Sequence, residues 1–172
     1  MKYTISIVRT KKELLELLKM VRTTWIATYT NPERNLSSSM IAAHIDQHNN
    51  DEYIKMRFKA LKGKNRKNWV AKNINGRIIG WIGCEINNEN IGSFGIYILP
   101  SYQGHGVGTK LLSKAIKWLG RAEKIEINVL DYNKKTIQFY KKFGLKFNGK
   151  KDDFIVGKFV GKGWSLRMEL KK

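Results

Sequence analysis

A short glycine-rich segment, QGHGVGT at residues 103–109, carries the clearest chemical signal in the sequence. It follows an apolar run at 96–99 that predicts a buried strand, and Pro100 ends that strand because proline has no N–H to donate. Helical periodicity begins at Thr109. A strand, a glycine loop and a helix in this order gather unpaired backbone N–H groups and the positive end of a helix dipole at one point. We therefore predict an anion site here, and most simply a phosphate site.

Other uses of such a glycine loop fit less well. A dinucleotide-binding loop follows the first strand of a parallel array and is paired with an acid on the next strand. Here the loop lies beyond the middle of the chain and follows a predicted antiparallel meander. A P-loop ends in Gly-Lys-Ser/Thr, whereas residues 108–110 read Gly-Thr-Lys. A plain turn does not require glycine at 104, 106 and 108.

Two blocks of the sequence resemble the GNAT superfamily of N-acetyltransferases. The segment QGHGVG at 103–108, after a strand ending in Ile-Leu-Pro, is similar to the acetyl-CoA signature of that superfamily. The signature is Arg or Gln, two variable residues, Gly, one variable residue, then Gly or Ala. The segment NKKTIQFYKKFGL at 133–145 is similar to the superfamily's block of Asn, six residues, Tyr, then Gly-Phe. Leu145 replaces the usual Phe, which changes packing and not chemistry.

The resemblance covers nearly the whole chain, because the order of the predicted elements also agrees. It implies one N-acetyltransferase domain at 1–172, with an α/β fold in which helices flank a mixed, mostly antiparallel central sheet. The segment WIATY at 25–29 resembles one common in branches that acetylate small molecules and polyamines. The implied activity is direct transfer of acetyl from acetyl-CoA to a primary amine of a polyamine, another small molecule or a protein.

The resemblance also implies how the cosubstrate would be held. Backbone N–H groups from Gly104 to Thr109 would bind the pyrophosphate, and glycine would allow the close approach. The strand before the loop is expected to splay from its neighbour, so that pantetheine pairs with its backbone and the Ile98 N–H polarises the thioester carbonyl. The cofactor-binding residues implied in this way are Ile96, Ile98, Gln103, Gly104, His105, Gly106, Val107, Gly108, Thr109, Asn133 and Tyr140.

Tyr140 is the general acid that the resemblance implies. Its phenol, with an ordinary pKa of about 10, would protonate the departing CoA thiolate. The same residue also fits a structural place on the inner face of its helix. Asn133 would cap that helix and bond the cofactor arm, and a bare helix cap would look the same.

The general base is not identified by the sequence, although an alkyl ammonium acceptor requires one. Glu85 and Asp131 are the nearest candidates, and each fits a surface or ion-pair role equally well. His44 and His48 lie four residues apart on a predicted helix and would share a face. The residues between them lack the glutamate of the zinc-protease motif, and no third ligand is evident. We therefore predict no metal site.

The formal net charge is +19, from 33 lysines and arginines against 14 acids. Such a charge attracts anions, and nucleic acid or the ribosome is a partner that it would fit. Lysine outnumbers arginine by 25 to 8, and because phosphate readers favour arginine, a compositional bias is the preferred interpretation. The segment 55–67, which contains no acid, is the best candidate for a basic patch. A non-catalytic module that binds nucleic acid or the ribosome is the alternative function.

Hydrophobic periodicity supplies the elements that would position these residues. Cys84 is the only cysteine of the 172 residues, and no apolar run is long enough to span a bilayer, so we expect a cytoplasmic protein. An oligomer and the identity of the amine are left open. The expected strands are 3–8, 68–72, 77–86, 91–99 and 124–130, with one or more in 146–170, and the expected helices are 11–29, one around 40–45, 51–61, 109–119 and 134–142.

Overall fold

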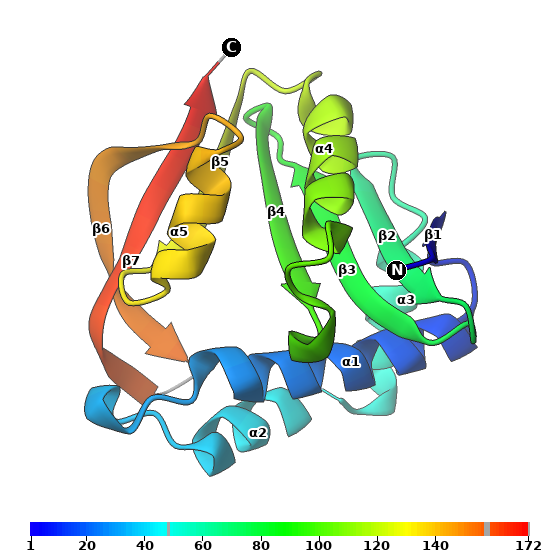
Figure 1. Ribbon diagram of the computed structural model, residues 1–172, viewed down its shortest axis with the longest axis horizontal. Helices are drawn as coiled ribbons and strands as arrows, with labels where there is room; N and C mark the ends of the chain where they lie inside the picture. The colour runs from blue at the N-terminus through cyan, green and yellow to red at the C-terminus, as the bar shows by residue number, and fades with distance from the viewer. Residues whose placement is uncertain (48, 157–158, 172) are drawn as a thin grey trace.

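The computed structural model describes residues 1–47, 49–156 and 159–171, and its centre is a seven-stranded sheet (Figure 1). Only β4 and β5 run parallel among the neighbouring strands, and every other pair is antiparallel. The prediction of a mixed, mostly antiparallel sheet is confirmed. In sheet order the strands are β1 (Tyr3–Ile7), β2 (Arg66–Asn73), β3 (Ile78–Ile86), β4 (Ile91–Ile98), β5 (Lys124–Leu130), β7 (Phe159–Lys171) and β6 (Lys146–Val156).

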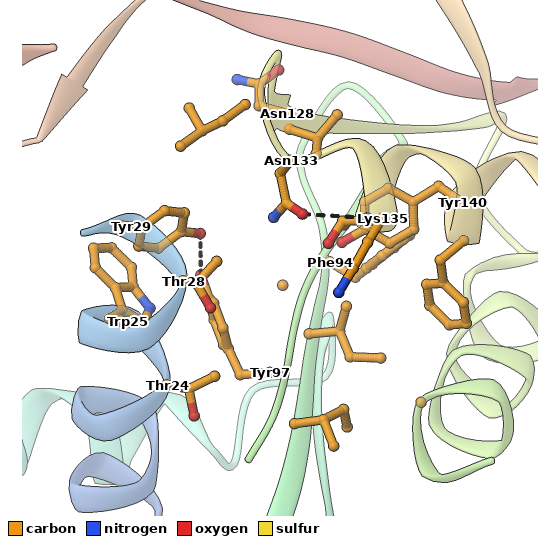
Figure 2. A pocket seen from close by; sticks show the side chains of 18 of the residues that line it. Thr24, Trp25, Thr28, Tyr29, Phe94, Tyr97, Asn128, Asn133, Lys135 and Tyr140 are labelled. Carbon is orange, nitrogen blue, oxygen red and sulfur yellow. Dashed lines mark hydrogen bonds between the residues drawn. The ribbon is translucent and has the colours of Figure 1, made fainter. Parts of the chain in front are cut away.

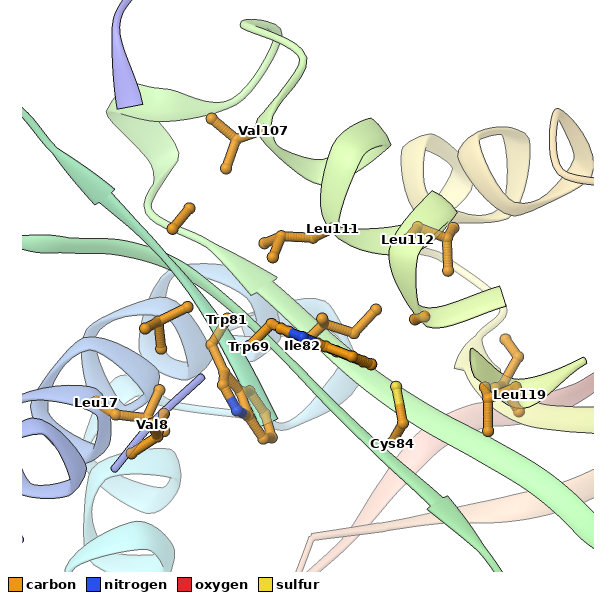
Figure 3. Packing of buried hydrophobic residues seen from close by; sticks show 14 of the residues in the cluster. Val8, Leu17, Trp69, Trp81, Ile82, Cys84, Val107, Leu111, Leu112 and Leu119 are labelled. Carbon is orange, nitrogen blue, oxygen red and sulfur yellow. The ribbon is translucent and has the colours of Figure 1, made fainter. Parts of the chain in front are cut away.

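Helices cover both faces of the sheet (Figures 1 and 3). Thr10 caps the first helix through a capping box with Glu13, as its sequence predicts. None of the helices in the described ranges is both long and apolar enough to cross a membrane. The helices are α1 (Lys11–Tyr29), α2 (Ser38–Asp46), α3 (Asp51–Ala60), α4 (Val107–Leu119) and α5 (Lys134–Lys141), with 3-10 turns at Pro32–Arg34 and Pro100–Tyr102.

The α4 helix is fixed by its buried face. Leu111, Leu112, Ala115 and Leu119 are fully buried against the sheet, and Figure 3 shows the three leucines on this inner face of the helix. Burial of a leucine side chain of this kind stabilises the fold by roughly 1.5–3 kcal/mol. The close fit is clearest at Gly80 of β3, where an added Cβ would stand 2.7 Å from Ile98 Cδ1 and 3.2 Å from Val107 Cγ1.

The sheet opens between its two parallel strands. The pairing of β4 with β5 is confined to Ile91↔Lys124 and Gly92↔Ile125, and beyond these residues the strands diverge (Figure 1). The splay expected of the strand before the glycine loop is therefore present. Because unpaired strand edges leave backbone N–H and C=O groups without partners, this opening offers hydrogen bonds to a molecule that enters it.

Candidate active site

A cavity of about 1050 Å³ occupies the opening between β4 and β5. Its wall combines α1 and α2 on one side with the glycine loop, α4 and α5 on the other (Figure 2). Most of the residues predicted to bind the cosubstrate contribute to this wall, namely Ile96, Ile98, Gln103, Gly104, Gly106, Gly108, Thr109, Asn133 and Tyr140.

The glycine loop reaches the cavity through its backbone. Gly104 and Gly106 both have φ +78, in the left-handed region that favours glycine. Gly106 is the N-cap of α4, so the helix begins at Val107, two residues before the predicted start. The first backbone hydrogen bond of the helix is from Lys110 N to Gly106 O, at 3.1 Å. The N–H groups just before Lys110 have no intrahelical acceptor and remain available to an anion.

Two predicted residues of the loop do not line the cavity. His105 is exposed, and its ring Nδ1 lies 2.8 Å from the Gln103 carbonyl oxygen. The Val107 side chain is buried in the core beside Gly80 of β3. Both residues are therefore near the site only through their backbone, because their side chains serve the loop and the core.

The edge of β4 presents backbone donors to the opening. Leu99 N donates to Ile79 O of β3 at 3.0 Å, and alternate residues of a strand direct their N–H groups to opposite edges. The N–H groups of Ile96 and Ile98 consequently face away from β3 and toward the opening. The Gln103 side chain donates to the Ile98 carbonyl at 3.1 Å, which ties the loop to the strand end and occupies that acceptor.

Tyr140 lies on the inner face of α5, at the edge of the cavity (Figure 2). It is 6% exposed, and its ring meets that of Phe94 edge-on with centroids 5.5 Å apart. Burial, and to a lesser extent the nearby phenol of Tyr29, raises the pKa of Tyr140 well above its ordinary value. The hydroxyl therefore stays protonated at neutral pH and can act as a proton donor.

Asn133 caps α5, as predicted, and also lies at the cavity. It is the N-cap of α5, where its Oδ1 accepts from Thr136 N at 3.3 Å. It also lines the cavity, into which the Lys135 side chain of the same helix extends (Figure 2). The start of α5 thus adds a second helix N-terminus and one cation to the wall that carries the glycine loop.

Aromatic side chains build the opposite wall. Trp25 packs edge-on against Tyr29 with ring centroids 5.0 Å apart, and lies 6.0 Å from the rings of both Tyr97 and His44. The hydroxyls of Tyr29 and Tyr97 are 3.3 Å apart, as the dashed line in Figure 2 marks. Burial raises the pKa of Tyr97 and, more strongly, that of Tyr29. Both phenols are therefore neutral hydrogen-bonding groups at the cavity surface.

The two walls of the cavity lie on opposite faces of the sheet. Ile98 faces α4, since it packs beside Gly80 together with Val107. Tyr97, the preceding residue, faces the other way and stacks on Trp81 with ring centroids 5.8 Å apart. Because successive side chains of a strand alternate between faces, both can line one cavity only where the sheet is open.

Two acids belong to the described part of the cavity wall, Asp152 and Asp153 of β6. Asp152 accepts from Arg167 at 2.9 Å. Asp153 makes no side-chain hydrogen bond or ion pair with any described residue. The sequence does not identify either acid as a site residue. Both lie on the β6–β7 hairpin, and its position beside the cavity depends on tertiary strand pairing.

The two residues considered for the general base lie elsewhere. Glu85 forms an ion pair with Arg66 at 2.6 Å on the outer part of β3. Asp131 lies 3.7 Å from Arg34. Neither belongs to the cavity wall. The acids that do line the cavity, Asp152 and Asp153, lie farther along the chain from the glycine loop than Glu85 and Asp131 do.

His44 is the member of the predicted histidine pair that the structure places. It lines the cavity and stacks on Trp25, whereas His48 lies outside the described residues. Over the ranges that the structure describes, no three His, Cys, Asp or Glu side chains gather as a metal site would require.

Comparison with known proteins gives one family. The model of the acetyltransferase (GNAT) family matches residues 25–145. An uncharacterized N-acetyltransferase of Methanocaldococcus jannaschii is 27% identical, over 78% of this chain and 68% of its own length. The thialysine N-epsilon-acetyltransferase of Mus musculus is 29% identical over 47% of this chain, and the match covers 46% of that enzyme.

A solved structure gives the same result for the fold. The PaiA N-acetyltransferase of Thermoplasma acidophilum, in complex with coenzyme A, superposes with a TM-score of 0.78 over 100% of both chains. Its sequence identity to this chain is 22%, so the likeness concerns the fold alone.

Proposed function

Because the chain belongs to the acetyltransferase (GNAT) family and is an acetyl-CoA-dependent N-acetyltransferase, we propose that its acceptor is a small primary amine carrying a second positive charge. The observation that carries this proposal is the composition of the wall on the acceptor side. That wall combines neutral aromatic rings with Asp153, a carboxylate that pairs with no described residue.

On the donor side, the phosphates of acetyl-CoA would lie at the start of α4. The free N–H groups between Gly104 and Thr109 and the helix dipole favour an anion there. Asn133 and Lys135, at the start of α5, belong to the same wall of the cavity, where they can meet the polar arm. The pantetheine would follow the open edge of β4 toward the N–H of Ile98.

The reaction would take place where β4 and β5 part. The N–H of Ile98, directed to the opening, would donate to the thioester carbonyl as negative charge develops on its oxygen. The acceptor ammonium first loses a proton to water; the neutral amine nitrogen then attacks the carbonyl carbon, the new C–N bond forms, and the C–S bond breaks. Tyr140, whose phenol is protonated at neutral pH, would transfer its proton to the departing thiolate. It would then regain a proton from the nitrogen of the new amide, which carries one surplus proton after the attack.

The charge of the acceptor wall explains how a strongly basic protein could take a cationic substrate. A net charge of +19 repels polycations at long range, and salt screens that repulsion. Asp153 and the partly paired Asp152 lower the potential locally at the cavity. The faces of Trp25, Tyr29 and Tyr97 attract an ammonium group through their quadrupoles. A diamine would therefore place its reactive amine at the thioester and its second ammonium near Asp153.

The relatives are consistent with this class of acceptor. The mouse enzyme is named for thialysine, a small amino acid acetylated on its side-chain amine, which carries a further ammonium group at neutral pH. The segment 25–29 supplies Trp25 and Tyr29 to the wall, in keeping with its resemblance to small-molecule and polyamine branches. A non-catalytic module is disfavoured, because the glycine loop, Asn133 and Tyr140 meet at one cavity.

A panel of amines tests the proposal. The protein is incubated with acetyl-CoA and butylamine, 1,4-diaminobutane, spermidine or thialysine, and the free CoA thiol is measured. We expect kcat/KM for the dicationic amines to exceed that of butylamine by at least tenfold, since about 1.4 kcal/mol suffices for that ratio. Turnover of peptide amines only, with no small amine accepted, would contradict the proposal while leaving the family assignment untouched.

A further inference from the structure

The solvent-facing side of α4 is a continuous row of cations. Lys110, Lys114 and Lys117 are exposed, and at 100° per residue they fall within roughly 60° of arc. Arg121 follows on the same line just after the helix ends at Leu119. No acid occurs within the helix, and its exposed positions are polar or basic.

Aromatic rings lie beneath three of the cations of this row. Lys110 Nζ lies 5.1 Å from the centroid of the Tyr3 ring, and Lys114 Nζ lies 5.9 Å from that of Trp69. The Arg121 guanidinium stacks 4.1 Å above Trp118. Cation–π contacts of this kind contribute about 0.5–1 kcal/mol at exposed sites and limit side-chain motion. The row is therefore more ordered than lysines spread freely over a surface.

The α3–β2 loop extends the row beyond the helix. Arg121 Nη2 donates to the Lys64 carbonyl oxygen at 3.1 Å, so the exposed Lys64 lies beside the C-terminal end of α4. The nearest following acid, Glu123, acts on Lys124 and does not bond the row. We define the basic ridge as Lys64, Lys110, Lys114, Lys117 and Arg121; none of them forms an ion pair with a described residue.

The ridge differs from the basic patch that the sequence suggests at 55–67. Within that segment, Arg66 is paired with Glu85, and Arg57 lies over the ring of Tyr53. Half of the segment belongs to α3, on the other face of the sheet from α4 (Figure 3). The segment is therefore divided between surfaces: Lys64 belongs to the ridge, whose other members lie at 110–121.

We propose that the basic ridge is a docking surface for the sugar–phosphate backbone of a nucleic acid. A single line of cations, about 17 Å from Lys110 to Arg121 at 1.5 Å per residue, matches a linear polyanion. Each cation that neutralises a phosphate releases condensed counterions, which gives affinity without reading sequence. A bilayer surface fits less well, because the outer face of α4 has no exposed apolar side chain to insert.

The ridge is separate from the cavity, and the proposal does not depend on the acetyl acceptor. None of its residues lines the cavity, and Lys110 leans toward Tyr3 of β1, away from the opening between β4 and β5. Nucleic acid and acetyl-CoA can therefore bind at the same time. The bound nucleic acid would hold the enzyme on a polyanionic scaffold, where cationic amines also concentrate as counterions.

Fluorescence anisotropy with a labelled 20-nucleotide oligouridylate tests the proposal, with the salt concentration varied. We expect micromolar binding at low salt and a slope of log K against log salt near −3, about 0.7 for each of four to five contacts. Lys114→Gln with Lys117→Gln should reduce the magnitude of the slope by about 1.4 and weaken binding about tenfold at 100 mM salt. Acetyl-CoA turnover with a small amine should be unchanged in this double variant.

A matched control separates the ridge from the overall charge. Lys11→Gln with Lys12→Gln removes two exposed lysines of α1 and lowers the net charge equally. Binding that falls as much in this control as in the ridge variant would overturn the proposal, because diffuse charge would then suffice. Binding abolished by saturating CoA would also overturn it, since the cosubstrate site would be responsible. So would capture by anionic phosphatidylserine vesicles with no binding of the oligonucleotide.

Discussion

The two walls of the cavity are built by different means. At the start of α4, the groups that face the opening are backbone N–H groups, held by Gly104 and Gly106 at φ +78, and α5 adds the side chains of Asn133 and Lys135. Opposite them, the wall consists of side chains, among which Trp25, Tyr97 and Asp153 come from three separate elements. A backbone wall fits a ligand part that never changes, and a side-chain wall can be altered residue by residue.

This difference corresponds to the two substrates. Every acetyl-CoA carries the same pyrophosphate and pantetheine, so one loop geometry serves any acetyl transfer. Acceptor amines differ in length and charge, and the acceptor wall can be matched to each by substitution. The comparison therefore predicts that changes to the donor wall affect all reactions, and that changes to the acceptor wall affect chosen amines only.

The largest effect is expected at the proposed proton donor, Tyr140. Tyr140→Phe removes the proposed proton donor and should lower kcat by at least a hundredfold, since positioned acids contribute about 10²–10⁴. The dissociation constant of acetyl-CoA should stay within twofold, because the ring still packs on Phe94. Steady-state kinetics and calorimetric titration measure both quantities.

A partly buried phenol outside the cavity provides the control. Tyr132 also has a pKa raised, to about 12, chiefly by burial, but it does not belong to the cavity wall. Tyr132→Phe should leave kcat nearly unchanged. A Tyr140→Phe enzyme with wild-type kcat would show that the hydroxyl has only a structural role.

Next in size is a change to the donor wall. Gly106→Ala forces an alanine into the left-handed region, at a cost of about 1–2 kcal/mol. The loop can relieve this strain only by moving its N–H groups, so we expect the dissociation constant of acetyl-CoA to rise at least tenfold. The loss should be the same whichever amine is the second substrate. Isothermal titration calorimetry with acetyl-CoA gives the measurement.

The chain contains a closely matched glycine for comparison. Gly76, in the β2–β3 turn, has φ +76, and neither it nor Gly106 has a neighbour within 4 Å of an added Cβ. Gly76→Ala should therefore cost the same free energy of unfolding without changing acetyl-CoA affinity. Equal loss of affinity in both variants would mean that stability, and not loop geometry, is responsible.

The two walls also differ in how far the sequence predicts them. The glycine loop, the cap Asn133 and Tyr140 lie in two contiguous blocks, and local spacing encodes them. Tyr97 lines the cavity only because β4 and β5 diverge, and Asp153 lines it only because β6 pairs with β7. Asp153 is separated by 128 residues from Trp25, with which it shares the cavity. No local sequence pattern can predict that two residues so far apart line the same cavity.

The fold was predicted more completely than the acceptor wall, because local sequence patterns encode its elements. Helices and strands arise from short periodicity, and the predicted ranges agree with the described elements apart from small shifts at their ends. The α4 helix was predicted to start at Thr109, two residues later than it does. Its start at Val107 depends on the left-handed conformation of Gly106, which permits a cap without a side chain, whereas side-chain caps such as Thr10 are visible in the sequence.

The acceptor wall should respond selectively to loss of charge. Asp153→Asn removes one carboxylate while keeping its shape, so we expect KM for 1,4-diaminobutane to rise about fivefold, as befits an exposed ionic contact of about 1 kcal/mol. KM for butylamine and the affinity for acetyl-CoA should not change. Asp51→Asn, which removes an exposed acid from the first turn of α3, is the control. An equal rise for both amines would contradict a role for Asp153 in charge recognition.

The smallest expected effect concerns the hydroxyl pair of the acceptor wall. Tyr97→Phe removes the contact of 3.3 Å with the Tyr29 hydroxyl but keeps the ring that stacks on Trp81. We expect a two- to threefold rise in the acceptor KM and a stability loss of about 1 kcal/mol, the usual value of one hydrogen bond. Because burial raises the pKa of Tyr97, its phenol is neutral at both pH 7 and pH 9, and the ratio of wild-type to variant KM should be the same at the two values. A ratio that grows with pH would mean that the phenol ionises and takes protons from the amine, and the acceptor wall would then contribute chemistry as well as recognition.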